Sequence, residues 1–187
     1  MRIIGGAFRG RRLSSVGKGD EPARLRPTSD RVRESLYNVL MSRYAERIEG
    51  ARVLDLFAGT GALGLEALSR GAARVVFVEN GRVAQKLLRQ NIELCGVADA
   101  SQILARDARK LGRNPADPYH LIFLDPPYGK SLGEAALSAA LAQDWISESS
   151  LIVWEEGGSV KIPKGLVLDD ERAYGDTVVR FLSVSAN

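Results

Sequence analysis

The sequence predicts an α/β fold: a doubly wound, mostly parallel sheet of seven strands, with helices on both faces and a small N-terminal β-hairpin arm. Three observations support this prediction. After Gly50, short apolar runs alternate with segments whose apolar residues recur at helical spacing. Some of these runs, such as residues 121–124, are apolar throughout, as strands buried on both faces are. A glycine-rich turn follows the first run, and 187 residues suffice for one substantial domain.

The elements are expected in alternating order along the chain. Ile3 and Ile4 before two glycines, and Leu13 after two arginines, predict a short hairpin followed by a loop. Thr28 or Ser29 can cap the helix that begins there. Strands are predicted at 52–57, 74–79, 102–105, 120–124 and 151–154, helices through 63–68, 80–96 and 132–143, and a closing antiparallel pair at 166–168 and 177–184. We expect two regions, a basic hairpin and loop over 1–27 and the main domain over 28–187.

Positive charge is concentrated at the front of the chain. Residues 1–33 contain nine Lys/Arg and three Asp/Glu and carry +6, whereas the remainder carries −3 from 17 basic and 20 acidic residues. A basic segment on a near-neutral domain is typical of a polyanion binder, whose phosphate contacts give salt-dependent affinity. A solvated basic face is the alternative. Arg31, Arg33 and Arg43 lie off the apolar stripe of the first long helix, where they would reach a ligand or stay in water.

Composition argues against several classes of protein. Cys95 is the only cysteine and His120 the only histidine, so neither an internal disulfide nor a Cys/His zinc site is expected. The first thirteen residues carry four arginines and no apolar core like that of a signal peptide, and no run approaches 18 apolar residues. We expect a cytoplasmic monomer that uses no metal and binds no membrane.

Four residues, Asp125-Pro126-Pro127-Tyr128, follow directly on the apolar run 121–124. Asp125 is therefore expected at the carboxyl end of a buried strand, where open α/β sheets place their ligands. The prolines stiffen the turn and leave the carbonyl oxygens of Asp125 and Pro126 able to accept hydrogen bonds. Tyr128 can stack on a base, an interaction worth roughly 1–3 kcal/mol. The pattern predicts a site for a flat molecule with an amino group; an ordinary Pro-Pro turn is the alternative.

The glycine-rich turn over residues 59–64 matches the dinucleotide pattern G-x-G-x-x-G. Glu79 follows Gly59 by twenty residues at the expected end of the second strand, where a carboxylate can accept two ribose hydroxyls. Taken alone, this pattern would suggest NAD. Asp55, four residues before the first glycine, favours a cationic ligand over a pyrophosphate, and S-adenosylmethionine carries an ammonium and a sulfonium. Asp107 is expected to accept a hydrogen bond from the adenine amino group, with an exposed loop aspartate as the alternative.

In this order, the motifs resemble the amino-methylating class of S-adenosylmethionine-dependent methyltransferases, which have a Rossmann-like class I fold. The resemblance rests on Asp55–Gly61, Glu79, Asp107 and Asp125–Tyr128. Residues 1–11, 26–34 and 174–177 are similar to the RsmD-like family, bacterial enzymes that methylate the exocyclic N2 of one guanine in small-subunit ribosomal RNA. Only the amino-terminal stretches carry the resemblance to an enzyme specific for RNA guanine.

The resemblance implies methyl transfer to guanine 966 of 16S ribosomal RNA, within an assembling or assembled 30S subunit, with S-adenosylhomocysteine as the second product. The residues at the target base would be Asp125, Pro126, Pro127 and Tyr128. The cofactor site would consist of Asp55, Phe57, Ala58, Gly59, Gly61, Glu79 and Asp107. The RNA contacts would be Arg2, Arg9, Arg11 and Arg12.

Three other functions share parts of this pattern. An adenine-N6 DNA methyltransferase needs the same acceptors and the same stacking residue, although the chain lacks a separate target-recognition domain. A noncatalytic RNA-binding or assembly module would keep the fold without the chemistry. NAD-dependent oxidoreduction is disfavoured by the position of Asp55. Glu155 and Glu156 end an apolar run on the ligand side, where they would approach the substrate or lie in a solvated turn, and the solvated turn is the favoured expectation.

Overall fold

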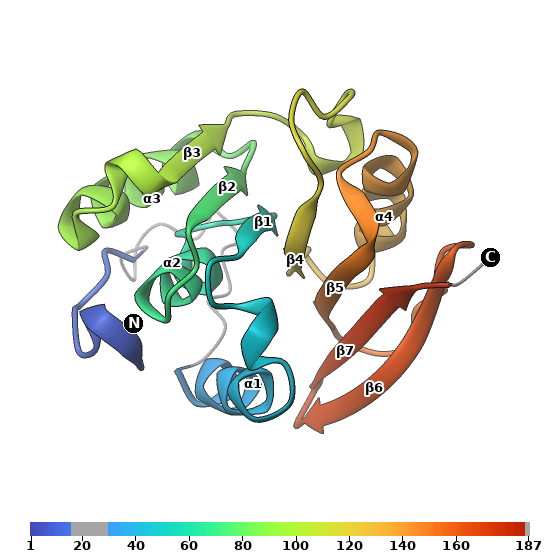
Figure 1. The fold of residues 1–187 in the computed structure, drawn as a ribbon, viewed down its shortest axis with the longest axis horizontal. Coiled ribbons are helices and arrows are strands. Elements are labelled where there is room, and N and C mark those ends of the chain that lie inside the picture. Colours follow the sequence, from blue (N-terminus) through green and yellow to red (C-terminus); the bar gives the residue numbers. More distant parts are fainter. Residues whose placement is uncertain (16–29, 186–187) are drawn as a thin grey trace.

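A seven-stranded sheet forms the centre of the protein (Figure 1). The computed structural model describes residues 1–15 and 30–185. The strand order is β3-β2-β1-β4-β5-β7-β6, in which the first five are parallel and β7 is antiparallel to both of its neighbours. The strands are β1 (Arg52–Leu56), β2 (Arg74–Val78), β3 (Ser101–Leu104), β4 (Tyr119–Leu124), β5 (Ile146–Glu156), β6 (Leu166–Tyr174) and β7 (Thr177–Val184). The predicted α/β sheet is confirmed.

Helices cover both faces of this sheet, as a doubly wound fold requires. The α-helices of the described ranges are α1 (Asp30–Arg43), α2 (Ala62–Ser69), α3 (Arg82–Cys95) and α4 (Leu132–Ala142). Apolar residues of α1, α2 and α3 share one core with Val53 and Phe77, whereas those of α4 share the opposite core with Leu54 and Val76. Neighbouring strand residues therefore point to different cores, which explains why the central strands are apolar along most of their length.

Two strands extend beyond their apolar residues. β5 begins at Ile146 instead of residue 151, and β6 continues to Tyr174 instead of ending at residue 168. Serines occupy much of the first extension, and Asp169, Asp170 and Glu171 lie in the second. β6 is an edge strand and most of its side chains are exposed. Its sequence therefore lacks the apolar run that marks a buried strand, which is why its full length was not predicted.

The first fifteen residues form a small antiparallel arm. The Ile3 N–H donates to the Arg11 carbonyl and the Gly10 N–H to the Ile3 carbonyl, each at 2.9 Å, and Arg2 pairs with Arg12. A short 3-10 helix, η1 (Gly6–Phe8), forms the tip. The predicted hairpin is therefore present as a narrow pair of segments. The proposed boundary between residues 27 and 28 lies outside the described part of the chain.

Buried polar groups fasten this arm to the helices. The Glu66 carboxylate on α2 accepts from the N–H groups of Ile4 at 2.7 Å and Gly5 at 2.8 Å. The Asn91 amide on α3 accepts from the Ser14 N–H at 2.7 Å and donates to the Ser14 carbonyl. Ile3 and Leu13 belong to the same apolar core as α1, α2 and α3. The arm therefore packs as part of the body over residues 1–15.

Arg33 completes this anchor and corrects the prediction for its side chain. It was expected to reach a ligand or stay in water, but its side chain is 0% exposed and donates to the Arg2 carbonyl and to Asp30. Its Nε lies 3.9 Å from Glu66, whose side chain is equally buried. A buried charge is stable only with a partner, and Glu66 lies on a different helix, so no local pattern indicated the pairing. Within the described ranges, no helix is long and apolar enough to cross a bilayer.

Candidate active site

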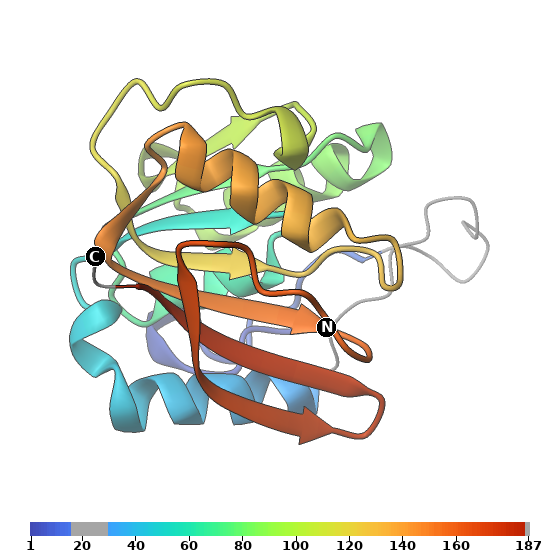
Figure 2. The same ribbon diagram turned by 90° about the vertical axis from the view of Figure 1, so that its right-hand side faces the viewer.

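Carboxylates gather at one edge of the sheet, where the parallel strands end. Asp55 lies near the end of β1, while Glu79, Asp107 and Asp125 follow β2, β3 and β4. β1, β2 and β4 run in register, so that Leu56 is paired with both Val78 and Leu124. The N-terminus lies on the side toward which β5 points (Figure 2), and the Thr60 hydroxyl lies 3.8 Å from the Met1 sulfur. This edge is where open α/β sheets place ligands.

The Asp55 side chain lies inside the protein beneath the glycine-rich turn. It is 2% exposed, and its Oδ2 accepts a hydrogen bond from the Gly64 N–H at 3.0 Å. Burial raises the pKa of Asp55 to about 7, and the nearby Glu79 carboxylate also acts to raise it, against the Gly64 hydrogen bond. A Cβ at position 64 would lie 2.4 Å from the Phe77 ring and 3.0 Å from the Asp55 carboxylate. Close packing therefore explains this glycine.

Glu79 holds the other side of the same turn. Its carboxylate accepts from the Gly59 N–H at 2.8 Å and from the Gly81 N–H at 2.6 Å. Gly59 and Gly61 have φ angles of +56° and +82°, in the left-handed region that favours glycine. Phe57 shares this region with φ +60°, which is unusual for an aromatic residue and marks the sharp exit from β1. Ala58 is buried at the start of the turn.

Asp107 lies beyond the third strand, and its carboxylate is bound by the side chain and backbone N–H of Arg109. Its carboxylate caps η5 (Ala108–Lys110) by accepting from the Arg109 N–H at 2.9 Å, and it also pairs with the Arg109 guanidinium. Hydrogen bonds from Arg109 hold the pKa of this carboxyl below its usual value. Asp107 is therefore ionised at neutral pH, and hydrogen bonds from Arg109 already engage both of its carboxylate oxygens.

The residues of this edge fit a cationic adenosine cofactor. The buried Asp55 carboxyl lies with Glu79 in a region of negative charge, where a cation would stabilise its ionised form. Glu79 is placed at the second strand end, where ribose hydroxyls are bound in folds of this type. Among the residues that the structure describes, no group of three or more His, Cys, Asp or Glu side chains could hold a metal ion.

The Asp125–Tyr128 segment leaves the end of β4 beside this region. Asp125 is half-buried, and its N–H donates to the Leu56 carbonyl on β1 at 3.5 Å. Pro126 is buried, Pro127 is exposed and Tyr128 is half-buried. Burial raises the pKa of the Tyr128 phenol, and Glu155 and Asp125 are both close enough to raise it further. The predicted target residues therefore lie together at the predicted strand end.

Residues from the carboxyl-terminal part of the chain surround Tyr128. Its hydroxyl donates to Glu155 Oε1 at 3.1 Å and lies 3.0 Å from the Thr177 hydroxyl. Glu156 accepts from the Gly129 N–H at 3.2 Å. The prediction of a solvated turn for Glu155 and Glu156 is wrong, because both residues are 4% exposed and form the end of β5 between two other strands. Sequence reasoning missed these contacts, although Thr177 belongs to a stretch already singled out.

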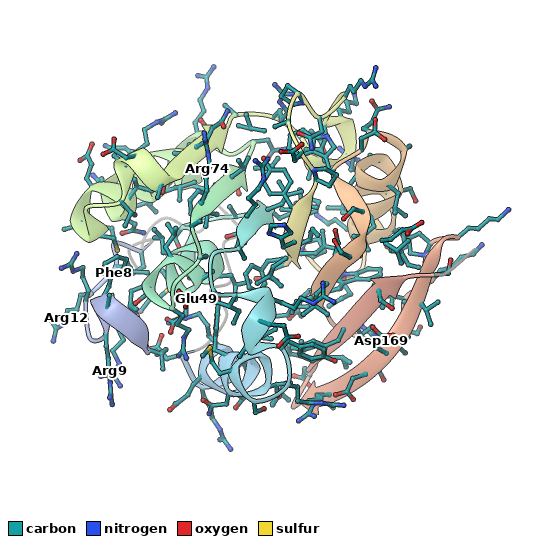
Figure 3. The ribbon with its side chains drawn as sticks, viewed as in Figure 1. Phe8, Arg9, Arg12, Glu49, Arg74 and Asp169 are labelled. Atoms are coloured by element: carbon teal, nitrogen blue, oxygen red, sulfur yellow. The ribbon has the colours of Figure 1, made fainter. Side chains whose placement is uncertain are left out.

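The four arginines expected to contact RNA all lie exposed on the arm. Arg9 and Arg12 project outward from it (Figure 3). Arg11 donates to the Leu94 carbonyl at 2.8 Å and lies over the Phe8 ring, and Arg2 lies 3.7 Å from Asp30. Met1, at the start of the arm, contacts Thr60 of the glycine-rich turn, so the arm adjoins the edge of the sheet at which the parallel strands end.

The sequence is similar to that of known proteins. A family model described as Conserved hypothetical protein 95 matches residues 1–183. The chain is 37% identical over 183 residues to Ribosomal RNA small subunit methyltransferase D of Escherichia coli strain K12, covering 96% of this chain and 88% of that protein. It is 35% identical over 158 residues to the protein of the same name from Haemophilus influenzae, covering 83% of this chain and 78% of that one.

Solved structures agree with the sequence relatives. The Escherichia coli protein yhhF, provisionally described as a methyltransferase, has a TM-score of 0.82 and 33% identity over 100% of this chain and 99% of its own. A hypothetical protein of Thermus thermophilus, TTHA0928, has a TM-score of 0.74 and 31% identity over 98% of this chain and 99% of its own. The fold is that of class I methyltransferases. This chain therefore belongs to the Conserved hypothetical protein 95 family and is a methyltransferase.

Proposed function

We propose that this enzyme transfers a methyl group from S-adenosylmethionine to the exocyclic N2 of one guanine of 16S ribosomal RNA, guanine 966. The products are N2-methylguanosine and S-adenosylhomocysteine. The observation that carries the proposal is the Asp125–Tyr128 segment at the end of β4, at the same edge of the sheet as Asp55 on the neighbouring β1 and Glu79 after β2. The names of the relatives support ribosomal RNA of the small subunit as the substrate.

The cofactor residues have separate tasks in this proposal. S-adenosylmethionine supplies an electrophilic methyl group on a sulfonium. Asp55 provides negative charge near the cationic end of the cofactor. Glu79 accepts hydrogen bonds from the ribose hydroxyls, and Asp107 accepts one from the adenine amino group. Gly59 and Gly61 allow the backbone to approach closely. The backbone of Phe57 and Ala58 would hold the methionine part of the cofactor.

Asp125 and the Pro126 carbonyl act on the target amine. The N2 of guanine is a poor nucleophile because its lone pair is delocalised into the ring. Two acceptors that hold its two hydrogens aim the nitrogen at the methyl group and stabilise the positive charge that develops on it. The amine becomes more acidic as the new bond forms, and its proton leaves to the Asp125 carboxylate or to water.

Tyr128 and the arm bind the RNA. A base inside a helix or a closed loop is not accessible to the acceptors, so the guanine leaves its stack and is received by the ring of Tyr128. Arg2, Arg9, Arg11 and Arg12 contact phosphates, with salt-dependent affinity. We propose that the enzyme works in the cytoplasm as a monomer, on RNA within an assembling or assembled 30S subunit.

The test is methyl transfer from labelled S-adenosylmethionine to unmodified 16S RNA and to small subunits that lack the modification. Digestion to nucleosides and mass analysis identify the product. N2-methylguanosine at one position supports the proposal, and the better substrate shows whether ribosomal proteins help to present the guanine. N6-methyladenosine would indicate the rival DNA-type chemistry, and no labelled nucleoside with either substrate would refute the proposed target.

A further inference from the structure

We propose that Glu155 and Thr177 are positioning residues that hold the ring of Tyr128 in the orientation that the flipped guanine requires. The inference rests on the proposed function, since it concerns the residue assigned to receive the base. It assigns a role to the end of β5 and to the hairpin β6–β7. Neither segment supplies a predicted cofactor or target residue.

The contacts of the phenol define its hydrogen-bond pattern. The Tyr128 oxygen lies 3.1 Å from Glu155 Oε1 and 3.0 Å from Thr177 Oγ1. A phenol has one proton to donate, and an ionised carboxylate can only accept. When Tyr128 donates to Glu155, the Thr177 hydroxyl must therefore donate to the phenol oxygen. Two partners on neighbouring strands, β5 and β7, thus fix the far end of the ring.

The ring itself is held along one edge by backbone. A Cβ built on Gly157 would lie 2.8 Å from Cδ2 of Tyr128, and 3.3 Å from the Asp176 carbonyl oxygen. Position 157 therefore has no space for a larger residue. Next to the ring, Glu156 accepts from the N–H groups of Gly129 at 3.2 Å and Gly157 at 3.1 Å, which ties the segment after Tyr128 to the end of β5.

This arrangement suits a stacking platform better than a simple packing residue. A tyrosine ring turns about two side-chain bonds, and stacking a base on a ring that is free to turn costs the entropy of ordering it. Hydrogen bonds at the hydroxyl and contact at Gly157 supply that order before RNA arrives. The hydrogen bonds of the phenol then serve to orient the ring. Thr177 should therefore affect methyl transfer only through its hydrogen bond with the Tyr128 hydroxyl.

A double-mutant cycle tests this dependence. Thr177→Val and Tyr128→Phe should each lower kcat/KM for RNA by about 5-fold, with an unchanged Kd for S-adenosylmethionine. The double variant should be no more impaired than the more impaired single variant, because both changes remove the same contact. Thr177→Ser, which keeps the hydroxyl, should restore most of the rate. Additive losses, or a loss in Thr177→Ser equal to that in Thr177→Val, would overturn the inference.

Matched controls lie on the same hairpin. Ser183→Ala removes a hydroxyl from β7, where it donates to the exposed Asp169, and Tyr174→Phe removes a phenol at the end of β6. Neither should change kcat/KM, and a loss in either would mean that the hairpin acts through general stability, against the inference. The experiment separates failure of this inference from failure of the proposed function. If the parent enzyme makes N2-methylguanosine but the losses in the double-mutant cycle are additive, only the inference is rejected. Absence of that product rejects both.

Discussion

The two halves of the proposed site, one for the cofactor and one for the target base, are held by hydrogen bonds that span different numbers of residues along the chain. On the cofactor side, Asp55 accepts from Gly64, nine residues away, and Glu79 accepts from Gly81 and Gly59, two and twenty residues away. On the target side, Tyr128 is held by Glu155 and Thr177, which are 27 and 49 residues away. The cofactor half is thus encoded largely in local motifs, whereas the target half is assembled by the tertiary fold.

This difference has a consequence for how each half responds to change. A local turn keeps its geometry as long as its own glycines and carboxylates are present. The target loop follows β4 and depends on β5 and β7, which are the next two strands in the sheet but lie much later in the chain. Substitutions on the target side should therefore spare cofactor binding, and substitutions on the cofactor side should weaken it while leaving RNA binding intact.

The largest effect is expected from Asp125→Ala. Removing a preorganised acceptor at the reacting nitrogen should lower kcat by roughly 10²–10³-fold, as the loss of one oxyanion-hole donor does. The Kd of S-adenosylmethionine, measured by calorimetry, should stay nearly the same. Asp169→Ala, which removes an exposed carboxylate on β6, serves as the control and should keep full activity. Full activity in the Asp125 variant would end the assignment of this residue.

Glu79→Ala should break the cofactor half alone. It removes a charged acceptor from Gly59 and from the expected ribose site, a loss of roughly 1.5–3 kcal/mol per hydrogen bond. The Kd of S-adenosylmethionine should rise by about 10- to 100-fold. RNA affinity, measured by filter binding, should not move. Glu93→Gln on the exposed face of α3 is the matched control; an unchanged cofactor Kd in Glu79→Ala would contradict the ribose role.

Asp55 should give the cofactor half a pH dependence. Its pKa is raised from 3.8 to about 7, so the folded protein retains a proton that the unfolded chain has released. Stability without cofactor should therefore fall as the pH rises from about 4 to about 7, by at most about 1.4 kcal/mol per pH unit, and then level off.

The same ionisation should favour cofactor binding. A cation binds the charged carboxylate, so the affinity for S-adenosylmethionine should increase up to about 10-fold per pH unit below about 7 and become flat above it. Asp55→Asn should flatten both profiles, measured by thermal unfolding and by calorimetry. Identical pH profiles in the variant and the parent protein would mean that another group titrates.

The smallest effects are expected on the arm. Arg9→Ala and Arg12→Ala should each reduce the slope of log K against log salt for RNA binding by about one, without a change in cofactor Kd. Arg74→Ala, at the opposite end of β2, provides the control and should leave the slope unchanged. A slope that does not respond to either arm variant would place the phosphate contacts elsewhere.

The sheet and the position of the glycine-rich turn could be predicted from the sequence because their signals are local, whereas the cofactor roles of the residues around that turn stay a prediction. Val53 and Leu54 pack into opposite cores, so apolar residues follow one another along the strand. In the turn from Gly59 to Gly64, glycines stand where the backbone has a positive φ, at Gly59 and Gly61. The burial of Arg33 against Glu66 could not be predicted, because the pairing joins two helices and looks like two ordinary charged residues in sequence.

The edge of the sheet was the other region that sequence patterns described poorly. β6 carries polar residues at its centre and continues to Tyr174, although its apolar run ends at Leu168. Glu155 and Glu156 look like surface residues, yet the pairing of β5 with β7 buries them. Only the position of each strand in the sheet determines whether a glutamate at its end is exposed.

The position of β7 also sets the order in which the protein can be completed during synthesis. β7 follows β6 along the chain but lies between β5 and β6 in the sheet. Until residues 177–184 have left the ribosome, β5 remains an unpaired edge, and such edges favour aggregation. A released chain that ends at Tyr174, and so lacks β7, should therefore show rapid proteolysis or hydrogen exchange in β5, with β1 and β4 already protected. Protection of β5 at that length would refute this order.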